Sequence, residues 1–139
     1  MRVVLDTNIL VSGLITQTGP PAQILNALRD GRLVAVMSEA TLAELAAVLR
    51  RPSLQRYVSR SRITLTRFVD DLRHQIDLVT PVRSDLSIRD ERDQIFLDLM
   101  ATQPTPQYFV TGDQDFEAPQ YSGVPVVSAA VFITLLKRP

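Results

Sequence analysis

Five short apolar segments alternate along the chain with longer segments whose apolar residues recur at helical spacing. The short segments are Arg2–Leu5, Leu33–Met37, Asp77–Val82, Gln107–Thr111 and Val124–Val127. Segments of this length and composition are typical of buried strands. Strands that alternate with helices form a mostly parallel sheet with helices on both faces. We therefore expect an α/β fold, in which ligands bind at the carboxyl ends of the strands.

The remaining segments with helical spacing predict the layers that cover this sheet. They are Ile9–Ile15, Pro21–Arg29, Glu39–Arg50, 53–75 as one or two short helices, Asp90–Ala101 and Ala129–Leu136. Ser38 and Ser128 precede two of them and are suitable N-caps. The chain has 139 residues, of which 45% are hydrophobic, and this suits one core. We expect a single domain over residues 1–139.

Two aspartates come immediately after predicted strands. Asp6 follows the first strand, and only Gly112 separates Asp113 from the fourth. Parallel strands end at the same edge of a sheet, so the two carboxylates are expected to lie close together. Each acid alone is equally compatible with a turn carboxylate that accepts backbone N–H groups. Because both aspartates follow strands that end at the same edge, we favour the hypothesis that they share one site.

Two further acids lie on predicted helices. Glu44 has small or apolar residues three and four positions away and no basic partner at helical spacing, so it needs a cation or a raised pKa. Asp90 is a natural N-cap, and Asp93, three residues later, is predicted to reach the sheet edge. Asp6, Glu44, Asp93 and Asp113 are therefore the candidate metal ligands and catalytic residues.

A cluster of four carboxylates predicts a divalent cation, because the acids would otherwise repel one another or take up protons. Oxygen ligands favour Mg²⁺ or Mn²⁺ over zinc. Hydrolysis of a phosphodiester is the chemistry that such an ion supports. Asn8 and Thr111 are expected to hold waters or ligating carboxylates in place, although both are also ordinary polar residues at strand ends.

Arginine is concentrated in one part of an otherwise balanced chain. The formal net charge is zero, yet 14 of the 15 basic residues are Arg, and seven of these lie between Arg50 and Arg73. Guanidinium groups suit phosphate oxygens. The candidates for contact with a phosphodiester backbone are Arg50, Arg51, Arg56, Arg60 and Arg62. A helical hairpin with ordinary surface charge explains the same pattern.

Other features exclude competing classes of function. The chain has no cysteine, which rules out disulfides and thiolate sites and fits a cytoplasmic protein. No apolar run is long enough to span a membrane. The one histidine, His74, lies in the Arg-rich segment, so a Ser-His-Asp triad lacks a good base.

Four motifs in order resemble the PIN domain family. They are Asp6-Thr7-Asn8 after the first strand, Ser38 to Glu44 on a helix, Asp90-x-x-Asp93 at a later helix start, and Val110-Thr111-Gly112-Asp113-x-Asp115. The chain is most similar to the subgroup of toxin components of toxin–antitoxin systems, which resemble VapC toxins. The resemblance implies a Rossmann-like sheet in the order 3-2-1-4-5 and an acidic quartet at Asp6, Glu44, Asp93 and Asp113. It adds Asp115 as an assisting residue beside Asn8 and Thr111.

The resemblance also implies a function and partners. It predicts a Mg²⁺- or Mn²⁺-dependent endoribonuclease that cuts single-stranded RNA, forms a homodimer and is inhibited by a small antitoxin protein. The alternative is a PIN module that binds RNA or a protein and does not cut. A DNA or flap-type nuclease is a third hypothesis, since an acidic cluster does not select the sugar.

Overall fold

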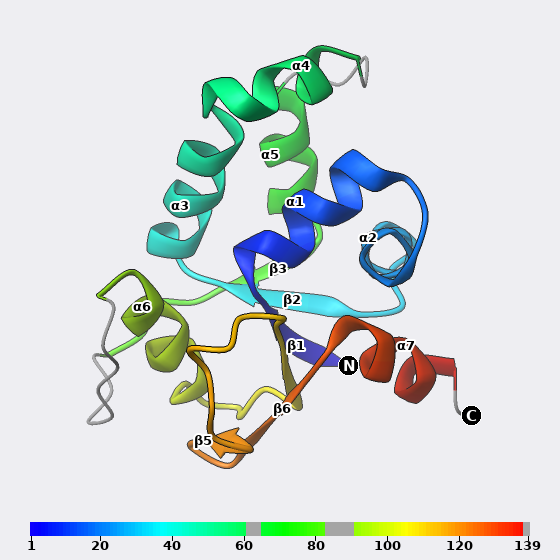
Figure 1. The fold of residues 1–139 in the computed structure, drawn as a ribbon. Helices are drawn as coiled ribbons and strands as arrows, with labels where there is room; N and C mark the ends of the chain where they lie inside the picture. The colour runs from blue at the N-terminus through cyan, green and yellow to red at the C-terminus, as the bar shows by residue number, and fades with distance from the viewer. Residues whose placement is uncertain (61–64, 83–90, 138–139) are drawn as a thin grey trace.

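The computed structural model describes residues 1–60, 65–82 and 91–137 and shows a sheet with helices on both faces (Figure 1). The strands are β1 (Arg2–Leu5), β2 (Val34–Met37), β3 (Ile76–Leu78), β4 (Tyr108–Val110), β5 (Gln120–Tyr121) and β6 (Val124–Val127). The helices are α1 (Thr7–Thr16), α2 (Pro20–Arg29), α3 (Glu39–Leu49), α4 (Pro52–Arg60), α5 (Leu65–Arg73), α6 (Glu91–Met100) and α7 (Ala129–Lys137). None of these helices is long and apolar enough to cross a bilayer.

The strand order is β3-β2-β1-β4-β6-β5, and all neighbours pair in parallel except β5 and β6. The predicted five-stranded parallel order is thus confirmed, with β6 in the place of the fifth strand. Strand β5 was not predicted. It pairs antiparallel with β6 through a two-residue turn, in which Ser122 and Gly123 both have positive φ values of 50° and 80°. This backbone is typical of a type I′ hairpin turn.

The third strand is shorter than predicted and begins earlier. It covers Ile76–Leu78, whereas the sequence predicted Asp77–Val82. Pro81 has no N–H to donate to a neighbouring strand, so the segment after Val79 cannot continue the parallel ladder. Val79 itself still donates its N–H to Met37 O at 2.8 Å.

Alternate residues of the strands divide the core between the two faces of the sheet. Val3 and Leu5 face the larger cluster, which contains α1, α2, α3, α5 and α7. Val4 and Phe109 face the smaller cluster, where α6 supplies Phe96. This alternation follows from the two-residue period of a strand. It leaves the carboxyl ends of β1 and β4 between α3 on one face and α6 on the other (Figure 1).

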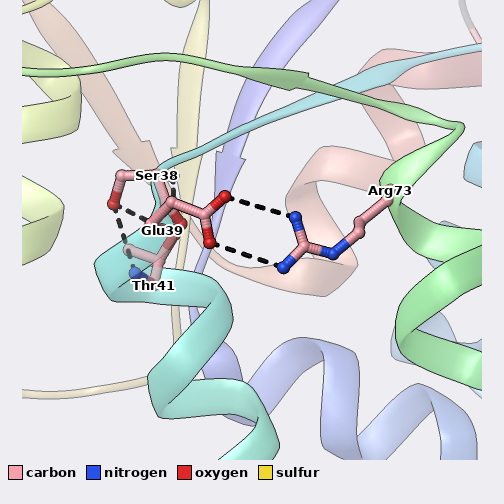
Figure 2. Close-up of polar contacts among 4 residues, drawn as sticks. All are labelled: Ser38, Glu39, Thr41 and Arg73. Carbon is pink, nitrogen blue, oxygen red and sulfur yellow. Dashed lines mark hydrogen bonds and ion pairs between the residues drawn. The ribbon is translucent and has the colours of Figure 1, made fainter. Parts of the chain in front are cut away.

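Helix α3 begins at a capping box (Figure 2). The Thr41 N–H donates to Ser38 Oγ at 3.2 Å, and the Ser38 N–H donates to Thr41 Oγ1 at 2.9 Å. The predicted N-cap at Ser38 is confirmed. Glu39 pairs with Arg73 of α5, with a shortest nitrogen–oxygen distance of 3.2 Å (Figure 2). The cap and the ion pair fix the start of α3 against α5.

Candidate metal centre

The register between β1 and β4 brings two predicted residues side by side. Leu5 pairs with Val110, so Asp6 and Thr111 are the first residues beyond the paired strands. The Asp6 N–H still donates to Val110 O at 3.0 Å, which extends the ladder by one bond. Both Asp6 and Thr111 are buried. The predicted meeting of the two strand ends at one sheet edge is present in the fold.

Thr111 links two of the candidate acids through its hydroxyl group. The Asp113 N–H donates to Thr111 Oγ1 at 3.0 Å, and Thr111 Oγ1 lies 2.6 Å from Asp6 Oδ2. Because the hydroxyl accepts from the amide, its own proton is directed to the carboxylate of Asp6. The hydroxyl thereby orients Asp6 and holds the loop that carries Asp113.

Burial raises the pKa of Asp6 above its ordinary value, and the nearby carboxylate of Asp113 raises it further. The Thr111 hydroxyl and the backbone N–H groups of Asn8 and Thr7 act in the opposite direction, because they stabilise the ionised form. The net shift is upward. A carboxylate in this state gains from a nearby cation, which favours its ionised form.

Glu44 reaches the same region from the middle of α3. Thr7 Oγ1 donates to Glu44 Oε2 at 2.7 Å, and Thr7 is buried at the start of α1. Thr7 is part of the Asp6-Thr7-Asn8 motif, but it was not among the predicted site residues. Its position between Asp6 and Asn8 at a helix start was the available signal. The contact itself depends on how α1 and α3 pack, which the sequence pattern does not specify.

Three aspartates form the tightest group of acids in the described part of the chain. Asp93, Asp113 and Asp115 each offer a carboxylate oxygen, and these three atoms lie within 4.8 Å of one another. Asp113 and Asp115 share a tight turn, in which the Asp115 N–H donates to Asp113 Oδ1 at 2.9 Å. Asp93 comes from the first turn of α6. The group therefore joins two elements that are distant in sequence.

Phe116 anchors the loop that carries Asp113 and Asp115. Its ring is buried and meets Phe109 of β4 edge-on, with 4.8 Å between ring centroids. It also lies edge-on to Phe96 of α6, at 6.4 Å. One aromatic cluster thus holds the loop, β4 and α6 together, and these are the elements that supply Thr111, the loop acids and Asp93.

All four predicted acids line one cavity of about 220 Å³. Its lining consists of Asp6, Thr7, Asn8, Glu44, Val48, Arg51, Asp93, Asp113 and Asp115. Asn8 and Asp115 are therefore on the cavity, while Thr111 supports Asp6 at its edge. Ligand oxygens are abundant, and neither His nor Cys is among the lining residues. This donor set fits Mg²⁺ or Mn²⁺.

The predicted arginines do not share one location. Arg51 lines the acidic cavity, whereas Arg50 lines a separate cavity between α3 and α5. Arg56 is exposed on α4. The side chain of Arg60, and both Arg62 and Asp90, lie outside the described residues. Contact between these arginines and RNA stays a prediction.

Comparison with known proteins gives the chain a family. The family model described as "PIN domain" matches residues 2–115. The uncharacterized protein MJ1680 of Methanocaldococcus jannaschii is 28% identical over 119 residues, which cover 83% of this chain and 72% of the relative. No solved structure matches the chain significantly.

Proposed function

The chain belongs to the PIN domain family, and on this premise we propose that it is a Mg²⁺- or Mn²⁺-dependent endoribonuclease for single-stranded RNA. PIN domains are in general metal-dependent nucleases. One observation carries the proposal: three aspartate oxygens lie within 4.8 Å of one another, in a cavity that Asp6 and Glu44 also line. Gathered carboxylates are unfavourable unless a cation is shared among them.

The residues of the cavity have distinct roles in this proposal. Asp6, Glu44, Asp93 and Asp113 hold the cation, and Asp115 assists them. When bound, the cation lowers the pKa of water and offsets negative charge on the phosphoryl oxygens. Thr111 orients Asp6, and Thr7 orients Glu44, through hydrogen bonds of 2.6 Å and 2.7 Å. The Asn8 amide offers both a donor and an acceptor for water or substrate.

Cleavage of labelled single strands tests the reaction. Purified protein with Mn²⁺ should cut RNA, and Asp6→Asn should abolish the cut while the protein stays folded. Identical product ladders for the two proteins would refute the nuclease. A parallel panel of single-stranded DNA and flap substrates distinguishes a ribonuclease from the other nuclease classes.

Thermal melting with Mn²⁺ separates the enzyme from a PIN module that binds without cutting. A ligand that binds only the folded state raises the melting temperature. A metal site should therefore give a rise across millimolar Mn²⁺. A flat melting temperature together with intact RNA binding would favour the binding module.

A toxin role within a type II toxin–antitoxin pair extends the proposal. Its support is the resemblance of the four ordered motifs to that subgroup. Expression of the wild-type chain should then arrest growth, and expression of Asp113→Asn should not. Equal growth of both strains, with cleavage confirmed in vitro, would leave the nuclease in place and remove the toxin role.

A further inference from the structure

We propose that Arg51 binds a phosphate group of the substrate strand at the acidic cavity, and that its neighbour Arg50 does not. This inference rests on the proposed function. It assigns a substrate-binding residue to the same site, and it selects one member of the Arg-rich segment by its position in the fold.

The turn between α3 and α4 brings Arg51 to the acids. Glu44 and Val48 lie four residues apart on one face of α3, Arg51 is the second residue after the helix ends at Leu49, and all three line the acidic cavity. Arg50 belongs to another face. It lines a cavity of about 310 Å³ between α3 and α5, together with Glu39 and Arg73. Two adjacent arginines thus serve two separate cavities.

The backbone at Arg51 is fixed by the junction between α3 and α4. The Arg51 N–H donates to Val48 O at 3.1 Å, and Arg51 O accepts from the Leu54 N–H at 2.9 Å. Helix α4 begins at the next residue, Pro52. The side chain of Arg51 therefore extends from a fixed backbone, so less backbone entropy is lost when its guanidinium binds an anion.

The guanidinium of Arg51 makes no ion pair or hydrogen bond within the described part of the chain. By contrast, Arg73 is held by both carboxylate oxygens of Glu39, at 3.2 and 3.4 Å. The donors of Arg51 thus stay available for an external oxygen anion, and phosphate matches their fork geometry.

The charge of the cavity shows why such a cation is needed. Five ionised carboxylates with one or two divalent ions leave the site negative, and a phosphodiester is itself an anion. Arg51 is the only basic residue among the lining residues that the structure describes. The positive charge of Arg51 offsets the repulsion between the carboxylates and the phosphates of the incoming strand, while the carboxylates bind the metal.

Binding can be measured without cleavage. A fluorescent single-stranded oligonucleotide is titrated in Ca²⁺, with Arg51→Ala, Arg51→Lys and the matched control Arg50→Ala. Arg51→Ala should weaken binding by roughly tenfold, since a lost hydrogen bond to a charged group has about this effect. It should also reduce the dependence of affinity on salt by about one phosphate contact. Arg51→Lys should recover part of the affinity, and Arg50→Ala should stay within about twofold of the wild type.

Two results would overturn the inference. One is equal binding by Arg51→Ala and Arg50→Ala. The other is unchanged binding by Arg51→Ala with a lower melting temperature and a larger stabilisation by Mn²⁺, which would make Arg51 an internal counterion of the acids. Arg51→Lys keeps the charge and so serves as the folded variant if Arg51→Ala is unstable.

The test also separates this inference from the nuclease itself. If the wild type fails to cut RNA in Mn²⁺ but the two arginine variants still differ in Ca²⁺, the phosphate contact stands and the nuclease fails. If the wild type neither binds the oligonucleotide in Ca²⁺ nor cuts RNA in Mn²⁺, both fail.

Discussion

Helix α3 carries charged residues on two faces, and the two faces neutralise their charges differently. Toward α5, Glu39 is paired with Arg73 (Figure 2). Arg50 lines the same cavity as these two residues. Toward α1 and α6, Glu44 faces a cavity where four aspartates gather. The first face pairs opposite charges, whereas the second gathers five carboxylates around Arg51, the one basic residue among the described lining residues.

The difference separates stability from function within one helix. Paired charges on the α5 side need no ligand, and exposed pairs of this kind contribute little to stability. On the acidic side, burial and the neighbouring Asp113 raise the pKa of Asp6, so the site is costly without a cation. A departure from favourable local electrostatics is expected where a protein binds a ligand. The following predictions test whether the two faces are separable.

The largest effect is expected when a carboxylate of the acidic face is neutralised. Asp113→Asn should lower Mn²⁺-dependent cleavage by at least about 100-fold, because it removes a proposed metal ligand. The matched change on the other face, Glu39→Gln, should leave the cleavage rate near that of the wild type. Rates of RNA cleavage under single-turnover conditions measure both. Equal losses would show that the two faces are coupled.

The next largest effect is expected from replacing Thr41 and Thr111, two threonines with the same hydrogen-bond pattern. Thr41 and Thr111 each accept a backbone N–H through the hydroxyl, and each donates to an oxygen. Both Thr→Val changes should reduce the free energy of unfolding by about 1–3 kcal/mol, since each leaves a buried or partly buried backbone N–H without its acceptor.

Only Thr111→Val should also weaken Mn²⁺ affinity, by roughly 10–100-fold, as expected when a group that orients a ligand is lost. Denaturant unfolding and Mn²⁺ titration measure the two quantities. Unchanged Mn²⁺ affinity in Thr111→Val would contradict the role given to its bond with Asp6.

A pH dependence should distinguish the acidic face. Between the ordinary Asp pKa of 3.8 and the raised pKa of folded Asp6, the folded protein holds a proton that the unfolded chain has released. Without metal, the free energy of unfolding should therefore decrease as pH rises through this window. Mn²⁺ binding should strengthen over the same window, because it needs the ionised form.

The Asp6→Asn variant isolates this contribution, since its side chain does not titrate. Its free energy of unfolding should have a smaller slope with pH than that of the wild type in the absence of metal. Denaturant unfolding at a series of pH values gives the two slopes. Identical slopes would mean that Asp6 does not hold the proton assigned to it.

The smallest effect belongs to the structural end of α3. Ser38→Ala removes the N-cap acceptor and should lower the free energy of unfolding by about 1 kcal/mol. Cleavage by the folded fraction should not change, because the cap lies outside the acidic cavity. A parallel loss of Mn²⁺ affinity would show that the start of α3 helps to position Glu44.

Much of this arrangement follows from short-range patterns. Strand direction alone predicts that Asp6 and Asp113 approach the same edge, because strand ends in a parallel sheet are set by the order of elements. The cap at Ser38 follows from residue chemistry. Strand β5 was missed because two residues carry no periodicity, and the Ser122-Gly123 turn was the only local signal for it.

The contacts that complete the site depend on packing between elements. The Thr7–Glu44 hydrogen bond joins α1 to α3, and no spacing within either helix determines it. The separation of Arg50 from Arg51 also depends on packing, because Arg51 lies in the turn between α3 and α4, where helical spacing does not apply.

The two edge strands of the sheet are short, and this affects how copies of the chain can associate. Strand β3 has three residues and β5 has two. Such edges offer few unpaired backbone groups, so another molecule gains little by adding a strand there. We therefore expect copies of the chain to associate through helix surfaces. The short edge strands also make the protein a poor template for fibrils.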